Sequence, residues 1–293
     1  NMDEQFRNLI AEERVIFLEK DISLEETFKS LKQDYYDIVY HLAAFNGTDN
    51  FYKYPAKVLR IGCLSTIFLL DWICNQNARP KVIYTSSSET YAGTTQVLKE
   101  SFPIPTPENI PLCIDDVTNV RWSYGASKLI GEVAFYSYSK MYNFDDFNIV
   151  RLHNIYGPRM GNGHVISQFI LRFLNEEFPF KIMGSDCTRS FCFIDDVLKS
   201  LDVIVESGAK KEIFHIGNDK EEIEILDLAK LLFDLQSKEY DFDIQPAPHG
   251  SVMRRCPNID KLKSIGMTGQ ISLQDGLRQT IDWYKEFLNK EDV

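Results

Sequence analysis

The stretch KVIYTSSSETY, residues 81–91, joins an apolar run to a row of polar side chains. The first four residues are typical of a buried strand in a parallel sheet. Three consecutive serines and then Glu89 stand where that strand should end. The stretch therefore predicts a buried strand followed by either a polar turn or a row of catalytic groups.

The sequence on both sides of this stretch alternates between short apolar runs and longer amphipathic segments. The predicted strands are residues 14–19, 37–44, 81–84 and 147–152, and the predicted helices are residues 21–32, 55–73 and 123–142. Strands that alternate with helices of this length predict an α/β fold, with a doubly wound parallel sheet covered on both faces.

The pattern changes after Gly157, where shorter strands and helices follow one another. We predict helices at 165–175 and from Asp196, strands near FKIMG, SFCFI and EIFHIG, and helices over EILDLAKLLFDL and SLQDGLRQTIDWYKEFL. This indicates a smaller mixed α/β lobe whose elements interleave with the sheet. We place an approximate boundary at residue 154, which gives domains 1–154 and 155–293.

Composition excludes several classes of protein. The chain has 293 residues, of which 44% are hydrophobic and 26% charged, so it can bury a sizeable core. A net charge of -11 argues against a nucleic-acid or anionic-membrane surface, although one basic pocket remains possible. The six cysteines have no CxxC spacing, which favours reduced thiols and a cytoplasmic protein.

The sequence indicates neither a membrane segment nor a metal site. The longest apolar run, residues 61–74, is interrupted by Asp71 and is too short to span a bilayer, so we predict a core helix there. No signal peptide stands at the start. The five histidines lack the spacing of metal ligands; they are His41, His153, His164, His215 and His249.

A nucleotide-binding domain of this class normally opens with a strand, a Gly-rich turn and a helix that receives the pyrophosphate. No GxGxxG or GxxGxxG occurs near the start of this sequence. We expect an opening segment of roughly 30 residues to precede it. The alternative is a protein that truly lacks this segment.

The sequence WSYGASK places Tyr124 and Lys128 four residues apart, on one face of the predicted helix. A tyrosine with its ordinary pKa of about 10 is a poor base at neutral pH. A nearby ammonium favours the phenolate and lowers this pKa. The pair therefore predicts a catalytic base with a tuning lysine, and the alternative is a packed tyrosine beside a surface lysine.

Four motifs occur in a fixed order, namely TSSSETY, YGASK, VRLHNIYGPRM and TRSFCFIDD. Together they resemble the extended short-chain dehydrogenase/reductase family, specifically its nucleotide-sugar epimerases, dehydratases and decarboxylases, from about Phe17 onward. The resemblance implies a Rossmann-like domain with a smaller C-terminal substrate lobe. It also implies NAD as cofactor, with NADP possible, a nucleotide-diphospho-sugar substrate, and a homodimer formed through the helices that start near Pro55 and Tyr124.

The resemblance also assigns roles to single residues. The implied catalytic residues are Ser87, Ser88, Glu89, Tyr124 and Lys128. The implied cofactor-binding residues are Asp21, Ile22, Leu42, Ala43, Ala44, Tyr124 and Lys128. The implied substrate-binding residues are Asn154, Arg159, Arg189, Arg254 and Arg255. Arginine suits a diphosphate because its planar fork meets two phosphate oxygens at once.

Other roles stay open for several of these residues. Asp21 could cap a helix, Asn154 could serve a turn, and Arg189 could be a surface cation. One of the two neighbouring arginines at 254 and 255 should face solvent. His153, at a position that is often aromatic or apolar in the family, is expected to be structural.

Glu89 bears on the step after oxidation. Many 4-epimerases have a small or neutral residue at this position, whereas 4,6-dehydratases and UDP-glucuronate decarboxylases typically have a glutamate. Once C4 is a ketone, the proton on C5 becomes acidic, and a carboxylate can remove it. The alternative for Glu89 is a turn cap or a lysine partner.

The predicted function is oxidation of a nucleotide-diphospho-sugar to a 4-keto intermediate in a 4,6-dehydratase-like or decarboxylase-like active site, within polysaccharide biosynthesis. A 4-epimerase or 4-dehydrogenase is one alternative. A non-catalytic scaffold or redox sensor of the same fold is another, which retention of Ser87, Tyr124 and Lys128 argues against.

Overall fold

The computed structural model describes residues 4–31, 35–247 and 252–291. His249 lies outside these residues. The main sheet has the strand order β1-β2-β3-β8, and every pairing in it is parallel. Its strands are β1 (Ile38–His41), β2 (Lys81–Ser87), β3 (Phe147–Leu152) and β8 (Glu212–Ile216). The predicted α/β fold with a Rossmann-like parallel sheet is therefore confirmed.

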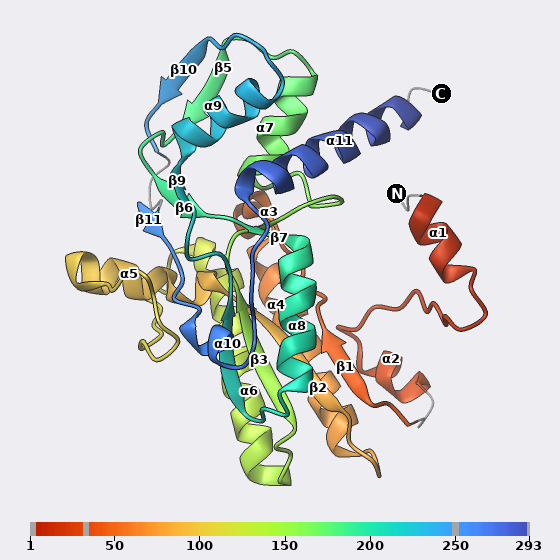
Figure 1. Cartoon of the computed structure of the whole chain (residues 1–293). Helices are drawn as coiled ribbons and strands as arrows, with labels where there is room; N and C mark the ends of the chain where they lie inside the picture. The colour runs from red at the N-terminus through yellow and green to blue at the C-terminus, as the bar shows by residue number, and fades with distance from the viewer. Residues whose placement is uncertain (1–3, 32–34, 248–251, 292–293) are drawn as a thin grey trace.

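Helices cover both faces of this sheet, because alternate strand residues point to opposite sides. Val82 and Tyr84 pack with α4 (Pro55–Cys74) and α6 (Ser123–Tyr142) in one core. Ile83, between them, packs with α8 (Ile194–Glu206) in another core on the opposite face. Figure 1 shows α8 on the near side of the sheet and α4 and α6 behind it. The sheet is thus doubly wound, as predicted.

Two glycines let the buried helices approach closely. A Cβ on Gly62 of α4 would lie 2.5 Å from the Ser127 hydroxyl of α6, and one on Gly131 would lie 2.1 Å from the Tyr84 hydroxyl of β2. Any larger side chain would push α6 away from its neighbours. The close packing holds α6, which carries Tyr124, against the sheet.

A second core lies above the carboxyl ends of the main strands, at the top of Figure 1. Its helices are α7 (Val165–Leu174), α9 (Ile225–Leu235) and α11 (Leu273–Glu291). Its strands form three small sheets. In the first, β5 (Phe180–Met183) pairs with β10 (Phe242–Gln245), and in the second, β6 (Thr188–Ser190) lies between β9 (Glu222–Glu224) and β11 (Arg254–Arg255). In the third, β4 (Ile155–Tyr156) pairs with β7 (Cys192–Phe193).

The remaining elements are short. They are α1 (Glu4–Ile10), α2 (Glu25–Ser30), α3 (Thr48–Lys53), α5 (Ala92–Leu98) and α10 (Asp260–Ser264), with single 3-10 turns at η1 (Ser88–Tyr91), η2 (Lys99–Ser101) and η3 (Val120–Trp122). None of the helices described is long and apolar enough to cross a membrane.

The strand predicted at residues 14–19 is wrong. Residues 15–20 have no regular secondary structure, and Ile16, Phe17 and Leu18 are 85%, 43% and 53% exposed. Among the described residues, β1 pairs only with β2, and no strand lies beside residues 14–19. A β-rich apolar run becomes a strand only when a neighbour accepts its backbone hydrogen bonds, and sequence alone does not reveal that neighbour.

Candidate active site

The end of β2 turns sharply into η1 and presents the polar residues of the opening stretch. The Ser87 hydroxyl accepts a hydrogen bond from the Glu89 backbone N–H at 3.2 Å, and the Thr90 hydroxyl donates to the Ser87 carbonyl at 2.7 Å. Serine and threonine commonly stabilise turns in this way. The polar turn and the candidate site are therefore the same local structure.

Helix α6 brings Tyr124 and Lys128 to this turn. Tyr124 is buried and stacks on Phe51, with ring centroids 5.0 Å apart. A Cβ on Gly125 would lie 2.7 Å from the Glu89 carbonyl oxygen, so glycine is required where α6 meets η1. The Lys128 ammonium donates to the Thr85 carbonyl at 2.7 Å and lies 5.8 Å from the centre of the Tyr124 ring.

Burial controls the protonation of both residues. Burial raises the pKa of Tyr124 to about 12, the charge of Glu89 adds to the rise, and a hydrogen bond with Ser87 opposes it. Burial lowers the pKa of Lys128 to about 8, while Glu132 opposes this change. The lysine can therefore lose its proton in mildly alkaline solution, far below its ordinary pKa.

A cavity of about 330 Å³ opens at the carboxyl ends of β1, β2 and β3, where open α/β sheets bind their ligands. It brings together nine of the predicted site residues: Leu42, Ala44, Ser87, Ser88, Glu89, Tyr124, Lys128, Asn154 and Arg255. The predicted catalytic set thus lies in one place, although its members are far apart in sequence.

Arg189 lines a neighbouring cavity of about 190 Å³ with Val165 and Phe191. Asn154 lines both cavities, and its side-chain amide donates to the Ser190 carbonyl at 2.9 Å. The two cavities therefore adjoin at Asn154. Arg189 is half-buried rather than a free surface cation.

Other predicted residues lie elsewhere. Ala43 is exposed and does not line the cavity that Leu42 and Ala44 line. Asp21 and Ile22 also line neither cavity. The Asp21 carboxylate accepts two hydrogen bonds from Ser23, at 2.8 Å to the backbone and 2.7 Å to the hydroxyl. These bonds hold the pKa of Asp21 below its ordinary value.

Two of the predicted arginines point away from the cavities. Arg159 is exposed and donates to the Gln5 side chain of α1. Arg254 is exposed and forms a two-point pair with Glu222, at 2.7 and 2.8 Å. Of the neighbouring pair, Arg255 is thus the one that faces the site, which sequence alone could not decide.

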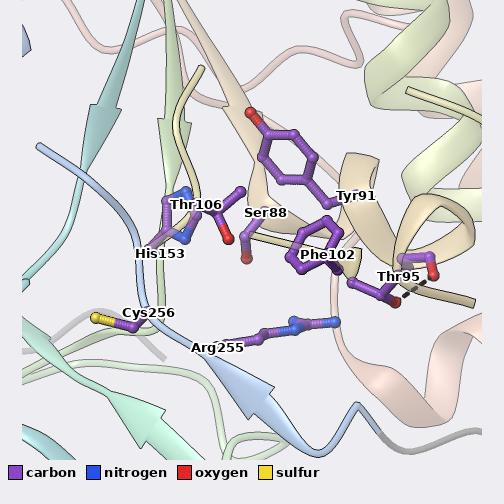
Figure 2. Close-up of a pocket in the computed structure, with 9 residues that line it drawn as sticks. Ser88, Tyr91, Thr95, Phe102, Thr106, His153, Arg255 and Cys256 are labelled. Carbon is purple, nitrogen blue, oxygen red and sulfur yellow. Dashed lines mark hydrogen bonds between the residues drawn. The ribbon is translucent and has the colours of Figure 1, made fainter. Parts of the chain in front are cut away.

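A third cavity, of about 10 Å³, lies beside the first and shares Ser88 and Arg255 with it. Figure 2 shows His153 and Thr106 on one side of these residues and Tyr91 and Phe102 on the other. The volume suits about one water molecule. The buried Nε2 of His153 has no hydrogen-bond partner among the described residues.

A protein-family model described as the NAD dependent epimerase/dehydratase family matches residues 2–217, more than half of the chain. The chain belongs to this family. The resemblance expected from the ordered motifs is therefore confirmed, as is the prediction of an enzyme in an NAD-dependent family.

The relatives of this chain are named for several different reactions on nucleotide sugars. A protein of Methanocaldococcus jannaschii, provisionally named UDP-glucose 4-epimerase, is 29% identical over 91% of this chain and 81% of its own. UDP-glucuronic acid decarboxylase 3 of Arabidopsis thaliana is 28% identical, over 82% of this chain and 68% of its own. The family thus includes nucleotide-sugar epimerases, dehydratases and decarboxylases.

A solved structure of another protein has the same fold as this chain. The dTDP-glucose 4,6-dehydratase DesIV of Streptomyces venezuelae, crystallised with NAD bound, superposes with a TM-score of 0.84. The alignment covers 97% of this chain and 84% of that one, at 22% identity.

Arg121 belongs to the site but was not among the predicted residues. Arg121 lies in η3, and its Nη2 is 4.0 Å from a Glu89 carboxylate oxygen. Arg121 stands three residues before Tyr124, about one helical turn away, and this spacing could have indicated that it lies near the site. Asn46 and His164 also line the cavity, and nothing in the sequence pointed to them.

None of the six cysteines of the chain forms a disulfide bond. In the part of the chain that the structure describes, no group of three or more His, Cys, Asp or Glu side chains could hold a metal ion. The side chains that line the larger cavity offer hydroxyl, ammonium, guanidinium and carboxylate groups.

Proposed function

We propose that the protein oxidises C4 of a nucleotide-diphospho-sugar and then uses Glu89 to remove the C5 proton, as in a 4,6-dehydratase. One observation carries this proposal: a single cavity holds Ser87, Tyr124 and Lys128 together with a charged carboxylate. The names of the relatives support the substrate class. The glutamate favours a step after oxidation over simple epimerisation.

We propose that the cavity receives the nicotinamide end of the dinucleotide next to the sugar. Leu42 and Ala44 offer apolar lining beside Lys128, whose buried ammonium can donate to a ribose hydroxyl. NAD, when bound, supplies the hydride acceptor and a positive charge that favours the phenolate of Tyr124. Use of NADP instead stays a prediction.

The first step removes two hydrogens from C4. Tyr124 takes the proton of the C4 hydroxyl, and Ser87 holds that hydroxyl by a hydrogen bond while the C4 hydrogen leaves as hydride. Lys128 stabilises the phenolate charge from its buried position. The product of this step is a 4-keto sugar.

The second step uses Glu89. Burial raises the pKa of Glu89 more than any single neighbouring charge lowers it. The charge and hydrogen bond of Arg255, together with the charges of Arg121 and Arg189, outweigh burial and hold the pKa below its ordinary value. Glu89 is therefore a carboxylate at neutral pH and can accept the C5 proton. The C6–O bond then breaks, and the C6 hydroxyl leaves as water with the proton that Glu89 has taken from C5. Return of the hydride to C6 and addition of a solvent proton to C5 complete the 4-keto-6-deoxy product, while Tyr124 releases its proton to solvent.

The adjoining cavities suit the rest of the substrate. We propose that residues 1–154 mainly hold the dinucleotide and residues 155–293 mainly hold the nucleotide sugar. The nucleoside would occupy the cavity of about 190 Å³, and the diphosphate would lie near Asn154, Arg189 and Arg255. Both arginines carry the planar fork that suits phosphate oxygens.

A panel of GDP-, UDP-, dTDP- and CDP-sugars tests this function on the NAD-loaded protein. We expect one of them to yield a 4-keto product that has lost water, as measured by mass spectrometry. Loss of carbon dioxide would instead indicate decarboxylation, and unchanged mass with inverted C4 would indicate epimerisation. No turnover of any sugar by loaded protein would contradict the enzyme assignment to this substrate class.

Homodimerisation also stays a prediction. Exposed apolar side chains gather on the outer faces of the two long helices, including Leu59 on α4 and Ile130, Val133 and Met141 on α6. Such a surface suits a second copy of the chain. Light scattering should give twice the mass of one chain, and a monomer would contradict this. Cytoplasmic location and polysaccharide biosynthesis stay predictions too.

A further inference from the structure

Glu89 is held by arginines on two sides. The Nη1 of Arg255 donates to one Glu89 carboxylate oxygen at 2.5 Å, and the Nη2 of Arg121 lies 4.0 Å from the other. The three side chains are only 14 to 20% exposed. Water therefore screens these charges weakly.

The cluster contains more positive than negative charge. Arg189 also interacts electrostatically with Arg255, Glu89 and Arg121, so three guanidinium groups surround one carboxylate. Burial and the charge of Arg255 lower the pKa of Arg189 to about 10. Its Nη1 donates only to backbone carbonyls, at 2.7 Å to Thr188 and 3.3 Å to Met253. Two positive charges thus lack a carboxylate partner within the cluster.

Arg121 has spare hydrogen-bonding capacity as well. Its Nε is buried and has no hydrogen-bond partner among the described residues. A buried cation without full hydrogen bonding is unfavourable, and an anion relieves the penalty. The surplus of two positive charges points to a ligand that carries about two negative charges, which is the charge of a sugar diphosphate. The unpartnered Nε shows that, among the described residues, Arg121 has no other strong partner to hold it away from Glu89.

The arrangement conflicts with catalysis by Glu89. A carboxylate that is paired with a guanidinium is a weak base, because the positive charge favours its ionised form. The Arg255 bond also occupies an oxygen that would accept the C5 proton. Glu89 and Arg255 nevertheless line the same cavity as Ser87 and Tyr124. Glu89 therefore becomes a stronger base for the C5 step once Arg255 has left it.

We propose that the diphosphate of the substrate replaces Glu89 as the partner of Arg255, so that substrate binding itself frees Glu89 to act as the C5 base. This inference rests on the proposed function. Arg255 and Arg189 then hold the diphosphate, while Arg121 remains near Glu89 and keeps it oriented. Because the diphosphate takes the place of the Glu89 carboxylate, the buried charge of Arg255 is paired with an anion both before and after the substrate binds.

In this arrangement Glu89 and the ligand compete for Arg255, so removing the charge of Glu89 should strengthen ligand binding. The variant Glu89→Gln should bind UDP or dTDP about tenfold more tightly than the wild type, because Arg255 is no longer engaged by a carboxylate. Isothermal titration calorimetry on the full chain loaded with NAD measures this change. Solvent deuterium should also no longer enter C5 in the variant, although exchange of the C4 hydride persists.

Two controls separate this effect from a general change in charge. Glu212→Gln removes the carboxylate partner of Lys261 at the start of β8. Glu212 is exposed and lines neither cavity, so this variant should leave nucleoside diphosphate affinity unchanged. The uncharged nucleosides uridine and thymidine should bind wild type and Glu89→Gln equally.

The outcomes distinguish the exchange from the proposed function. Equal or weaker binding of the nucleoside diphosphate by Glu89→Gln would overturn the exchange but leave the substrate class standing. Absence of nucleoside diphosphate binding by the wild type would overturn the substrate class itself. Tighter binding by Glu212→Gln as well would attribute the gain to net charge and would also overturn the exchange.

Discussion

Tyr124→Phe should lower the rate of C4 oxidation by a factor of about 100 to 10,000, the range that a positioned general base contributes. Only the hydroxyl is lost. The stacking of the ring on Phe51, with centroids 5.0 Å apart, should remain, so the fold should be unchanged. Reduction of bound NAD by the substrate, followed by absorbance, measures the step. Equal far-ultraviolet circular dichroism would establish that the variant is folded.

Tyr136→Phe is the matched control for this variant. Tyr136 lies on the same helix, and its hydroxyl donates to the Lys211 carbonyl at 2.9 Å, away from Ser87 and Lys128. It should oxidise C4 at the wild-type rate. If Tyr124→Phe oxidised C4 equally well, the assignment of the catalytic base would be wrong.

Lys128 gives the same step a pH signature. Because burial lowers the pKa of Lys128 to about 8, the ammonium loses its proton as the pH rises through 8. The phenolate of Tyr124 then loses its neighbouring positive charge. The rate of C4 oxidation should therefore fall above about pH 8, and a rate that stays level to pH 10 would exclude this role for Lys128.

Arg151→Met should lower the free energy of unfolding by about 3 to 5 kcal/mol, because it leaves the buried Glu132 carboxylate without its cation. Arg151 donates to the two oxygens of Glu132 at 2.9 and 2.6 Å, and the side chains are only 3% and 6% exposed. Glu132 also accepts from Ser86, and Arg151 also donates to Tyr91. Urea unfolding at neutral pH measures the loss.

Two further variants show whether the loss comes from an unpaired buried charge. The double variant Arg151→Met with Glu132→Leu removes both charges and should be more stable than Arg151→Met alone. Arg254→Met breaks the exposed pair with Glu222 and should change the free energy of unfolding by less than about 1 kcal/mol. A double variant as unstable as the single one would attribute the loss to packing.

Local pattern predicted most of the elements correctly. The helix predicted at 123–142 and the strand at 147–152 have those bounds in the structure, and the helix from Pro55 ends one residue beyond Ile73. These segments are buried on a regular face, so periodicity describes their environment. Residues 14–19 have a similar run of apolar residues but no neighbouring strand among the described residues, so the local pattern gave a wrong prediction there.

The candidate site was predictable to the extent that it depends on one turn or one helix. Ser87 is the last residue of the buried strand β2, and Glu89 lies in the turn directly after it. Tyr124 and Lys128 lie one helical turn apart. The placement of the arginines depends on segments that are far apart. Nothing local distinguishes Arg254, which pairs with Glu222 at the surface, from Arg255, which reaches the cavity.

The sequence by itself determined the parallel α/β fold, the order of the motifs and the residues at the end of β2. Spacing of 2 and 3.6 residues, and hydroxyl and carboxylate groups after a buried strand, are local properties. Only the tertiary structure decided that Arg255 pairs with Glu89, 166 residues away, and that Arg121 and Arg189 share that charge cluster. Long-range electrostatic pairing depends on distance and burial in the folded chain, which residue spacing does not encode.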